Sequence, residues 1–176
     1  MIVLVMGVAG AGKSTVGRGL DDALGFELAD ADAFHSAANK AKMGRGVPLD
    51  DADRAPWLRA LASAIDAWLA EGRDVVLACS ALRRAYREAL LRDRERTRIV
   101  YLKGSPDLIR ERLSRRSGHF AGSDLLESQL ATLEEPDDAL TVDVAAPPEA
   151  LVRQIVEGLR LAPRHASSSE DESGSR

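Results

Sequence analysis

The most constraining feature of the chain is a glycine-rich octapeptide, GVAGAGKS, at residues 7–14. It follows an apolar run, IVLVM at 2–6, and precedes a segment with helical periodicity. This setting of strand, loop and helix fits the phosphate-binding P-loop, in which glycines let backbone N–H groups curl around an anion. The pattern therefore predicts an α/β fold that binds a nucleoside triphosphate.

Each residue type in this loop has a predicted role. Loop N–H groups and the positive end of the following helix are expected to hold the phosphates. The Lys13 ammonium should reach the β- and γ-phosphates, while the Ser14 hydroxyl ligates Mg²⁺ and Thr15 contacts the α-phosphate. The predicted ATP-binding residues of the loop are Gly7, Gly10, Ala11, Gly12, Lys13, Ser14 and Thr15.

Alternation of strand and helix patterns predicts the rest of the fold. Four more apolar runs lie at 26–30, 74–80, 98–102 and 140–144, which gives five parallel strands flanked by helices. Helices are expected at 13–24, ending at Gly25; at 57–69, from its apolar stripe; from Pro106; at 125–133, opened by a capping box of Asp124 and Glu127; and from Pro148.

Composition limits the classes of function that the chain can serve. Its 176 residues suffice for one domain, placed at 1–161, while the Ser- and acid-rich residues 162–176 are expected to form a disordered tail. A formal net charge of −4 offers no basic field for nucleic acid. The single Cys79 excludes an internal disulfide, and its apolar neighbours predict a buried thiol.

The apolar start of the chain resembles neither a signal peptide nor a membrane helix. MIVLVM has no basic region before it and no cleavage site after it. No stretch elsewhere approaches the ~20 apolar residues that a membrane helix needs. We therefore expect a cytoplasmic, soluble protein without a membrane partner.

Two missing motifs narrow the class of nucleotide-binding protein. The guanine-reading motif NKxD has no good match, because Asn39-Lys40 is followed by Ala41-Lys42. The third strand ends in Cys79-Ser80, without the acid that a motor ATPase places there. These absences favour a small kinase over a GTPase or a motor.

An acidic pair marks the predicted acceptor side. The second strand ends in Asp30-Ala31-Asp32, and in extended backbone the residues i and i+2 face the same side. Two carboxylates would then point at the phosphates, one ordering Mg²⁺ through water and the other accepting the proton of the attacking hydroxyl. Which carboxylate is the base stays open, and the alternative is an acidic turn with solvated side chains.

Four sequence blocks carry a family resemblance. They are DADAFHSAANKAKMGRGVPLDDADRAPWL (30–58), ACSALRRAYREAL (78–90), RLSRRSGHF (112–120) and SQLATLEEP (128–136). In this order and spacing they resemble gluconokinases, which are P-loop sugar-acid kinases, and the resemblance runs from Met1 to about Leu161. It implies ATP and Mg²⁺ as cofactors, phosphate transfer to the 6-hydroxyl of D-gluconate, and a homodimer.

The sequence departs from the family pattern at three positions. The DGD that is common in the family is DAD here, the proline after the loop histidine is Ser36, and the lysine of the SALK block is Arg83. These changes keep both acids and the positive charge. They leave the expected activity in place and bear on affinity and fine specificity.

The resemblance also assigns roles on the acceptor side. Gluconate is an anionic polyol, so its site needs a guanidinium for the carboxylate and hydrogen-bonding groups for the hydroxyls. Arg54 and Arg87 match arginines of the family pattern and are the candidates for the carboxylate. Arg54 could instead form an ion pair with a neighbouring aspartate, and His35 could only brace its loop. The predicted substrate-binding residues are Asp32, His35, Lys42, Arg54, Ser80, Arg87 and His119.

A basic stretch before Gly118-His119-Phe120 is predicted to be a lid over ATP. Arg112 and Arg116 match the family pattern and join the ATP-binding set, while Arg115 is an extra charge. Lid closure would exclude water and offset charge on the transferring phosphoryl group. The predicted catalytic residues are Lys13, Asp30, Asp32 and Arg116, and the predicted metal contacts are Ser14 and, through water, Asp30.

Two other functions fit parts of the sequence. A shikimate- or nucleotide-type kinase would share the P-loop, but a nucleotide acceptor needs stacking aromatics, and the loop block 33–58 offers only Phe34 and Trp57. A nucleotide-binding regulator without catalysis would need neither a proton acceptor nor an arginine lid. The acidic pair therefore favours an enzyme.

Overall fold

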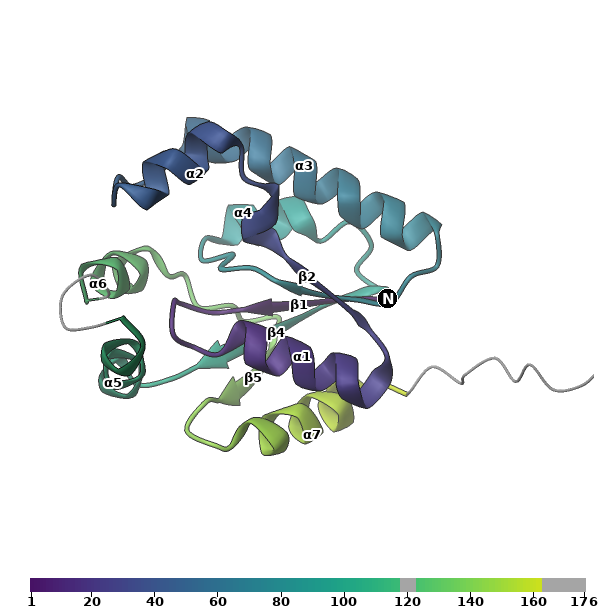
Figure 1. The fold of residues 1–176 in the computed structure, drawn as a ribbon. Coiled ribbons are helices and arrows are strands. Elements are labelled where there is room, and N and C mark those ends of the chain that lie inside the picture. The colour runs from purple at the N-terminus through teal and green to yellow at the C-terminus, as the bar shows by residue number, and fades with distance from the viewer. Residues whose placement is uncertain (118–122, 163–176) are drawn as a thin grey trace, which may run out of the picture.

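The fold is a parallel sheet with helices on both faces, as the sequence predicts (Figure 1). The computed structural model describes residues 1–117 and 123–162. The sheet has five strands in the order β2-β3-β1-β4-β5, and every neighbouring pair is parallel. The strands are β1 (Ile2–Met6), β2 (Glu27–Asp30), β3 (Val75–Ala78), β4 (Thr97–Lys103) and β5 (Leu140–Asp143).

Helices cover the two faces and surround the carboxyl ends of the strands. Figure 1 shows α1 and α7 under the sheet, α3 and α4 above it, and α5 and α6 beyond the strand ends. The helices are α1 (Lys13–Leu24), α2 (Ala37–Gly44), α3 (Asp51–Ala70), α4 (Arg84–Leu90), α5 (Pro106–Ser117), α6 (Ser123–Thr132) and α7 (Pro148–Leu159), with a short 3₁₀ helix, η1 (Ala31–Phe34).

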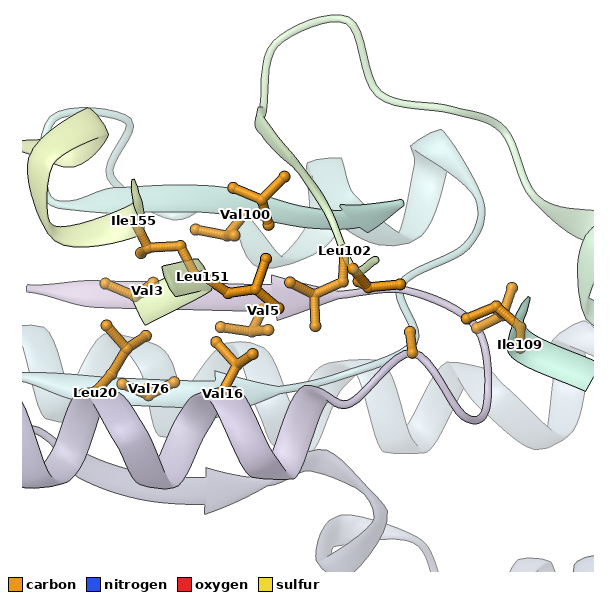
Figure 2. Close-up of a cluster of buried hydrophobic side chains, with 14 of the residues drawn as sticks. Val3, Val5, Val16, Leu20, Val76, Val100, Leu102, Ile109, Leu151 and Ile155 are labelled. Carbon is orange, nitrogen blue, oxygen red and sulfur yellow. The ribbon is translucent and has the colours of Figure 1, made fainter. Parts of the chain in front are cut away.

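Alternating side chains of the strands feed two apolar cores. On β1, Val3 and Val5 join the core between the sheet and helices α1 and α7, which Figure 2 shows, whereas Ile2 and Leu4 join the core between the sheet and α3. All five residues of this strand are buried, because a parallel sheet that is covered on both faces leaves no solvent side. The two cores make the sheet a rigid support for the loops at its edge.

The register of the strands brings the loops that follow β1, β2 and β3 together at the carboxyl edge of the sheet. Ala78 of β3 pairs with Val5 of β1 on one side and with Asp30 of β2 on the other. The P-loop, the Asp30 turn and the segment after β3 therefore leave the sheet side by side. In open parallel sheets, ligands bind in this crevice outside the carboxyl ends of the strands.

Several predicted helix boundaries are confirmed. α1 spans the predicted 13–24 and ends at Gly25, whose φ of 68° is the left-handed conformation that glycine adopts readily. The predicted starts at Pro106 and Pro148 are also observed. The Cys79 thiol is buried, and burial raises its pKa to about 12.

Two predicted helix starts are wrong. α3 begins at Asp51 instead of 57, because the Asp50 carboxylate accepts the N–H of Asp53 and the Asp53 carboxylate accepts the N–H of Asp50. This capping box starts the helix before Pro56, so that this proline lies inside the helix, where it cannot donate a backbone hydrogen bond. α6 begins at Ser123, so that Asp124 lies within the helix and not at its cap.

No helix in the described ranges is long and apolar enough to cross a membrane. The predicted tail lies outside the described residues from position 163 onward. Leu161, just before it, still packs against the core under α7.

Candidate active site

The P-loop connects β1 to α1 and turns through left-handed backbone. Gly10 has a φ of 82° and Gly12 a φ of 97°, which residues with a Cβ rarely adopt. A Cβ on Gly10 would also lie 2.8 Å from Cγ of Leu113 on α5. The loop thus needs glycine at these positions for its conformation and, at Gly10, for its packing against α5.

Lys13 is the first residue of α1, and its side chain folds back over the loop. Its Nζ donates to the carbonyl oxygens of Gly7, at 2.9 Å, and Val8, at 3.1 Å. Burial lowers the pKa of Lys13, while Cys79 and the carboxylates of Asp32 and Asp30 oppose that shift. The predicted phosphate lysine and the predicted acidic pair are therefore electrostatic neighbours.

The N–H of Ala9 in the P-loop has a partner that the sequence analysis missed. It donates to Oε1 of Gln129, on α6, over 2.6 Å. Gln129 belongs to the SQLATLEEP block, and only that block signals its importance. This bond joins the P-loop to a helix that lies 120 positions away in the sequence.

The acidic pair lies at the carboxyl end of β2, but its geometry differs from the prediction. The backbone is not extended through Asp32, because η1 begins at Ala31. Oδ1 of Asp30 accepts the N–H of Asp32 at 2.9 Å, as an N-cap does. Asp30 thus fixes the turn that carries Asp32, and both side chains remain exposed.

The turn is held from behind by Trp57 of α3. Its indole Nε1 donates to the carbonyl oxygen of Ala31 at 2.8 Å, within the buried interior. The ring of His35 stacks on the Trp57 ring with centroids 4.6 Å apart. His35 is 8% exposed, and its Nδ1 has no hydrogen-bond partner among the described residues. Burial lowers the pKa of His35.

Helix α2 is fastened to the first turn of α3. Lys42 Nζ contacts both carboxylate oxygens of Asp53, at 2.6 and 2.8 Å, and the buried Asn39 donates to the Asp53 carbonyl at 2.7 Å. The Lys42 ammonium holds the pKa of Asp53 below its usual value. The predicted substrate contact Lys42 is therefore committed to an ion pair with α3.

A second cluster joins the first turns of α3 and α4. The Tyr86 hydroxyl donates to Oδ1 of Asp51 at 2.6 Å, and Arg83 donates to both oxygens of that carboxylate at 3.0 Å. Arg54 Nη1 lies 3.4 Å from the Tyr86 hydroxyl and 3.9 Å from Asp51. Two guanidinium groups share one carboxylate here, so that the cluster carries excess positive charge.

The segment after β3 contains the predicted residues Ser80 and Arg87. Ser80 is half-buried at the strand end, beside the Asp30 turn. Arg87 is buried on α4 and donates through Nη1 to the carbonyl oxygens of Ala81, at 3.0 Å, and Leu82, at 3.1 Å. The guanidinium of Arg87, one of the two predicted to bind the substrate carboxylate, is thus engaged by the backbone.

The predicted lid is described only in part. Arg112 of α5 donates to the Val144 carbonyl at 2.6 Å, and Arg115 pairs with Glu111 at 2.6 Å on the exposed side of the helix. The Arg116 side chain and His119 lie outside the described residues. Their assignments stay predictions.

The P-loop at the end of β1 and the acidic turn of Asp30 and Asp32, which lies electrostatically close to Lys13, define a P-loop kinase that phosphorylates a small molecule with ATP. Among such kinases the chain belongs to the gluconokinase family, because relatives named gluconokinase match most of its length. "Probable gluconokinase" of Mus musculus is 45% identical over 152 residues, which is 77% of this chain and 83% of that protein. "Gluconokinase" of Gluconobacter oxydans is 47% identical over 136 residues, covering 77% of this chain and 76% of that one.

Two further comparisons agree with this placement. A family model described as an AAA domain matches residues 2–136. The crystal structure of a gluconokinase from Sinorhizobium meliloti superposes with a TM-score of 0.81 at 42% identity, over 90% of each chain. Shikimate kinase from Aquifex aeolicus, at 20% identity and a TM-score of 0.56, shares the fold alone.

Proposed function

We propose that the protein transfers the γ-phosphate of ATP to the 6-hydroxyl of D-gluconate, giving 6-phosphogluconate and ADP. The observation that carries the proposal is that Trp57 of α3 contacts the acidic turn through the Ala31 carbonyl, so that Asp32 and the Arg54 guanidinium of the same helix belong to one site. Both groups also act on the pKa of His35, which stacks on Trp57. A site that offers a carboxylate as proton acceptor and a guanidinium suits an acceptor with a hydroxyl and a carboxylate.

Asp32 is the group that we assign as the base. Oδ1 of Asp30 is occupied by the N–H of Asp32, whereas the Asp32 carboxylate is exposed at the site. A carboxylate that accepts the proton of an attacking hydroxyl raises the nucleophilicity of that oxygen. Lys13 is the cation that stabilises negative charge on the phosphates, and its burial strengthens this interaction.

The residues around the P-loop also fit Mg²⁺. The Ser14 hydroxyl is exposed at the start of α1, and Asp30 offers a carboxylate at the end of β2, which β3 separates from β1. Hydroxyl and carboxylate oxygens are the ligands that Mg²⁺ prefers, and it usually keeps several waters. When bound with ATP, Mg²⁺ neutralises charge on the phosphates, and Asp30 would act on it through water.

Arg54 is the arginine that we assign to the gluconate carboxylate. Arg87 is held by backbone carbonyls and Lys42 by Asp53, whereas Arg54 is only loosely placed on Tyr86 and Asp51. A planar guanidinium can bind a carboxylate through two parallel hydrogen bonds. Ser80 and His35 are proposed to contact hydroxyl groups, and Arg112, Arg116 and His119 are proposed to act on ATP and on the closed site.

An assay panel tests the substrate. Purified protein with MgATP is offered gluconate, shikimate, nucleoside monophosphates and other sugar acids, and ADP release is followed. We expect gluconate alone to raise the rate well above the ATPase background. If gluconate gives no stimulation, the proposed substrate is wrong, and stimulation by shikimate or a nucleotide would select the alternative kinase.

A pair of variants tests the assignment of the base. Asp32→Asn should lower kcat by about 10²–10⁴-fold, the usual contribution of a general base, while ATP binding stays close to normal. Asp30→Asn keeps a side-chain oxygen for the Asp32 N–H and serves as the matched control with a smaller loss. Equal losses in the two variants would show that the carboxylates share the role.

A cytoplasmic location, a homodimer and the absence of a nucleic-acid partner complete the proposal. They rest on the net charge of −4 and on the family resemblance. Sedimentation of the purified protein would test the dimer, since a monomer at micromolar concentration would contradict it.

A further inference from the structure

A residue with a Cβ occupies left-handed backbone next to the acceptor site. Ala81 has a φ of 44°, although L-residues other than glycine, asparagine and aspartate rarely adopt this conformation. It is buried, and it directly follows Ser80 at the end of β3. Unfavourable backbone of this kind persists only where surrounding contacts hold it, and such sites cluster in active centres.

Arg87 supplies the contacts that hold Ala81. Its Nη1 donates to the carbonyl oxygen of Ala81, at 3.0 Å, and to that of the next residue, Leu82, at 3.1 Å. The Leu82 carbonyl also accepts the N–H of Glu134, at 2.9 Å, and the Glu134 carboxylate accepts the N–H of Arg84. The segment from Ala81 to Arg84 is therefore held by α4 and by the segment that follows α6.

Arg87 also has acidic neighbours within the protein. Burial lowers its pKa and Arg84 adds to that shift, while the carboxylates of Asp138, Glu134 and Asp137 oppose it. These acids come from the segment that follows α6. A guanidinium that is buried, bonded to carbonyls and surrounded by acids has little left to offer a substrate carboxylate.

We infer that Arg87 is a positioning residue, which holds Ala81 in its left-handed conformation so that Ser80 faces the acceptor site. The inference rests on the proposed function for its activity readout, and it replaces direct contact of Arg87 with gluconate. Glycine adopts a positive φ without such support. With glycine at position 81, the activity of the protein should therefore depend less on Arg87.

Three variants of the full chain test the inference: Arg87→Met, Ala81→Gly and the double variant. Arg87→Met should lower kcat/KM for gluconate by about tenfold or more, with the affinity for ATP changed less than about twofold. In the Ala81→Gly background the same substitution should cost several-fold less. A loss confined to the KM for gluconate, and equal in both backgrounds, would overturn the inference and return Arg87 to the substrate.

Stability gives a second readout that does not depend on the acceptor. We call the hydrogen bonds from Arg87 to the Ala81 and Leu82 carbonyls the clamp. If the clamp supports Ala81, Arg87→Met should shift the midpoint of urea unfolding less in the Ala81→Gly background than in the parent, whereas independent sites would give additive shifts. Arg87→Lys replaces Arg87→Met if the latter does not fold. If the parent protein fails to phosphorylate gluconate, the proposed function fails, but a non-additive unfolding cycle still supports the clamp and an additive one overturns it.

Discussion

The indole Nε1 of Trp57 donates to the carbonyl oxygen of Ala31 at 2.8 Å, which places a core residue of α3 directly behind the acidic turn. Ala31 stands between Asp30 and Asp32, so that this bond fixes the peptide that separates the two carboxylates. The same Trp57 ring carries His35 on its face. The apolar stripe of α3 is thus also the support of the acceptor site.

Trp57→Phe should separate packing from hydrogen bonding at this point. The phenyl ring can still stack with His35, but the buried Ala31 carbonyl loses its donor, which costs about 1–3 kcal/mol of unfolding free energy. Because the turn is loosened, we expect kcat to fall while the KM for ATP changes little. Urea unfolding and steady-state kinetics measure both effects, and an unchanged kcat in a destabilised protein would contradict the supporting role.

His35 should make stability depend on pH. Burial lowers its pKa in the folded protein, so below its unfolded value of about 6.5 the unfolded chain binds the proton more tightly. The contribution of neutral His35 to stability is therefore present above this value and declines as the pH falls through it. His35→Phe keeps a ring on Trp57 without a titrating group.

The measurement is urea unfolding of both proteins between about pH 5 and pH 7.5, a window that brackets the unfolded pKa of histidine. The unfolding free energy of the parent minus that of His35→Phe should rise with pH. A flat difference across the window would show that the folded protein does not lower the pKa of this group.

Two glycines of the P-loop should respond differently to alanine. Gly12→Ala meets no atom within 4 Å and carries only the left-handed strain, which costs about 1–2 kcal/mol. Gly10→Ala carries similar strain and also brings a Cβ to 2.8 Å from Leu113. We expect Gly10→Ala to lower the unfolding midpoint further than Gly12→Ala, and equal losses would show that Leu113 simply moves away.

Substitutions of Gln129 should change the affinity for ATP and not the affinity for the acceptor substrate. Gln129→Met has a similar length but leaves the Ala9 N–H without its acceptor, so the P-loop should be less ordered and the affinity for ATP weaker by about three- to tenfold, the worth of one net hydrogen bond. Gln129→Glu keeps the acceptor and adds negative charge beside the phosphates. Isothermal titration with an ATP analogue compares them, and normal affinity in both variants would leave the bond without a role in ATP binding.

Much of the fold could be read from local features of the sequence. The glycines and Lys13 of the P-loop, the five apolar strands and the bounds of α1 follow from backbone preference and from the period of the apolar residues, which act between neighbours along the chain. The start of α3 differs from the predicted residue 57 for a local reason, since Asp50 and Asp53 form a capping box.

The roles of individual side chains depended on contacts that no local pattern contains. Sequence determined that the chain carries a P-loop, an acidic pair after the second strand and a set of basic residues suited to an anionic acceptor. Only the tertiary structure decided that Arg87 faces the Ala81 carbonyl, that Lys42 pairs with Asp53 and that Gln129 reaches Ala9. The physical reason is that a charged or amide side chain accepts any partner of suitable polarity, and packing of distant segments selects which partner comes within reach.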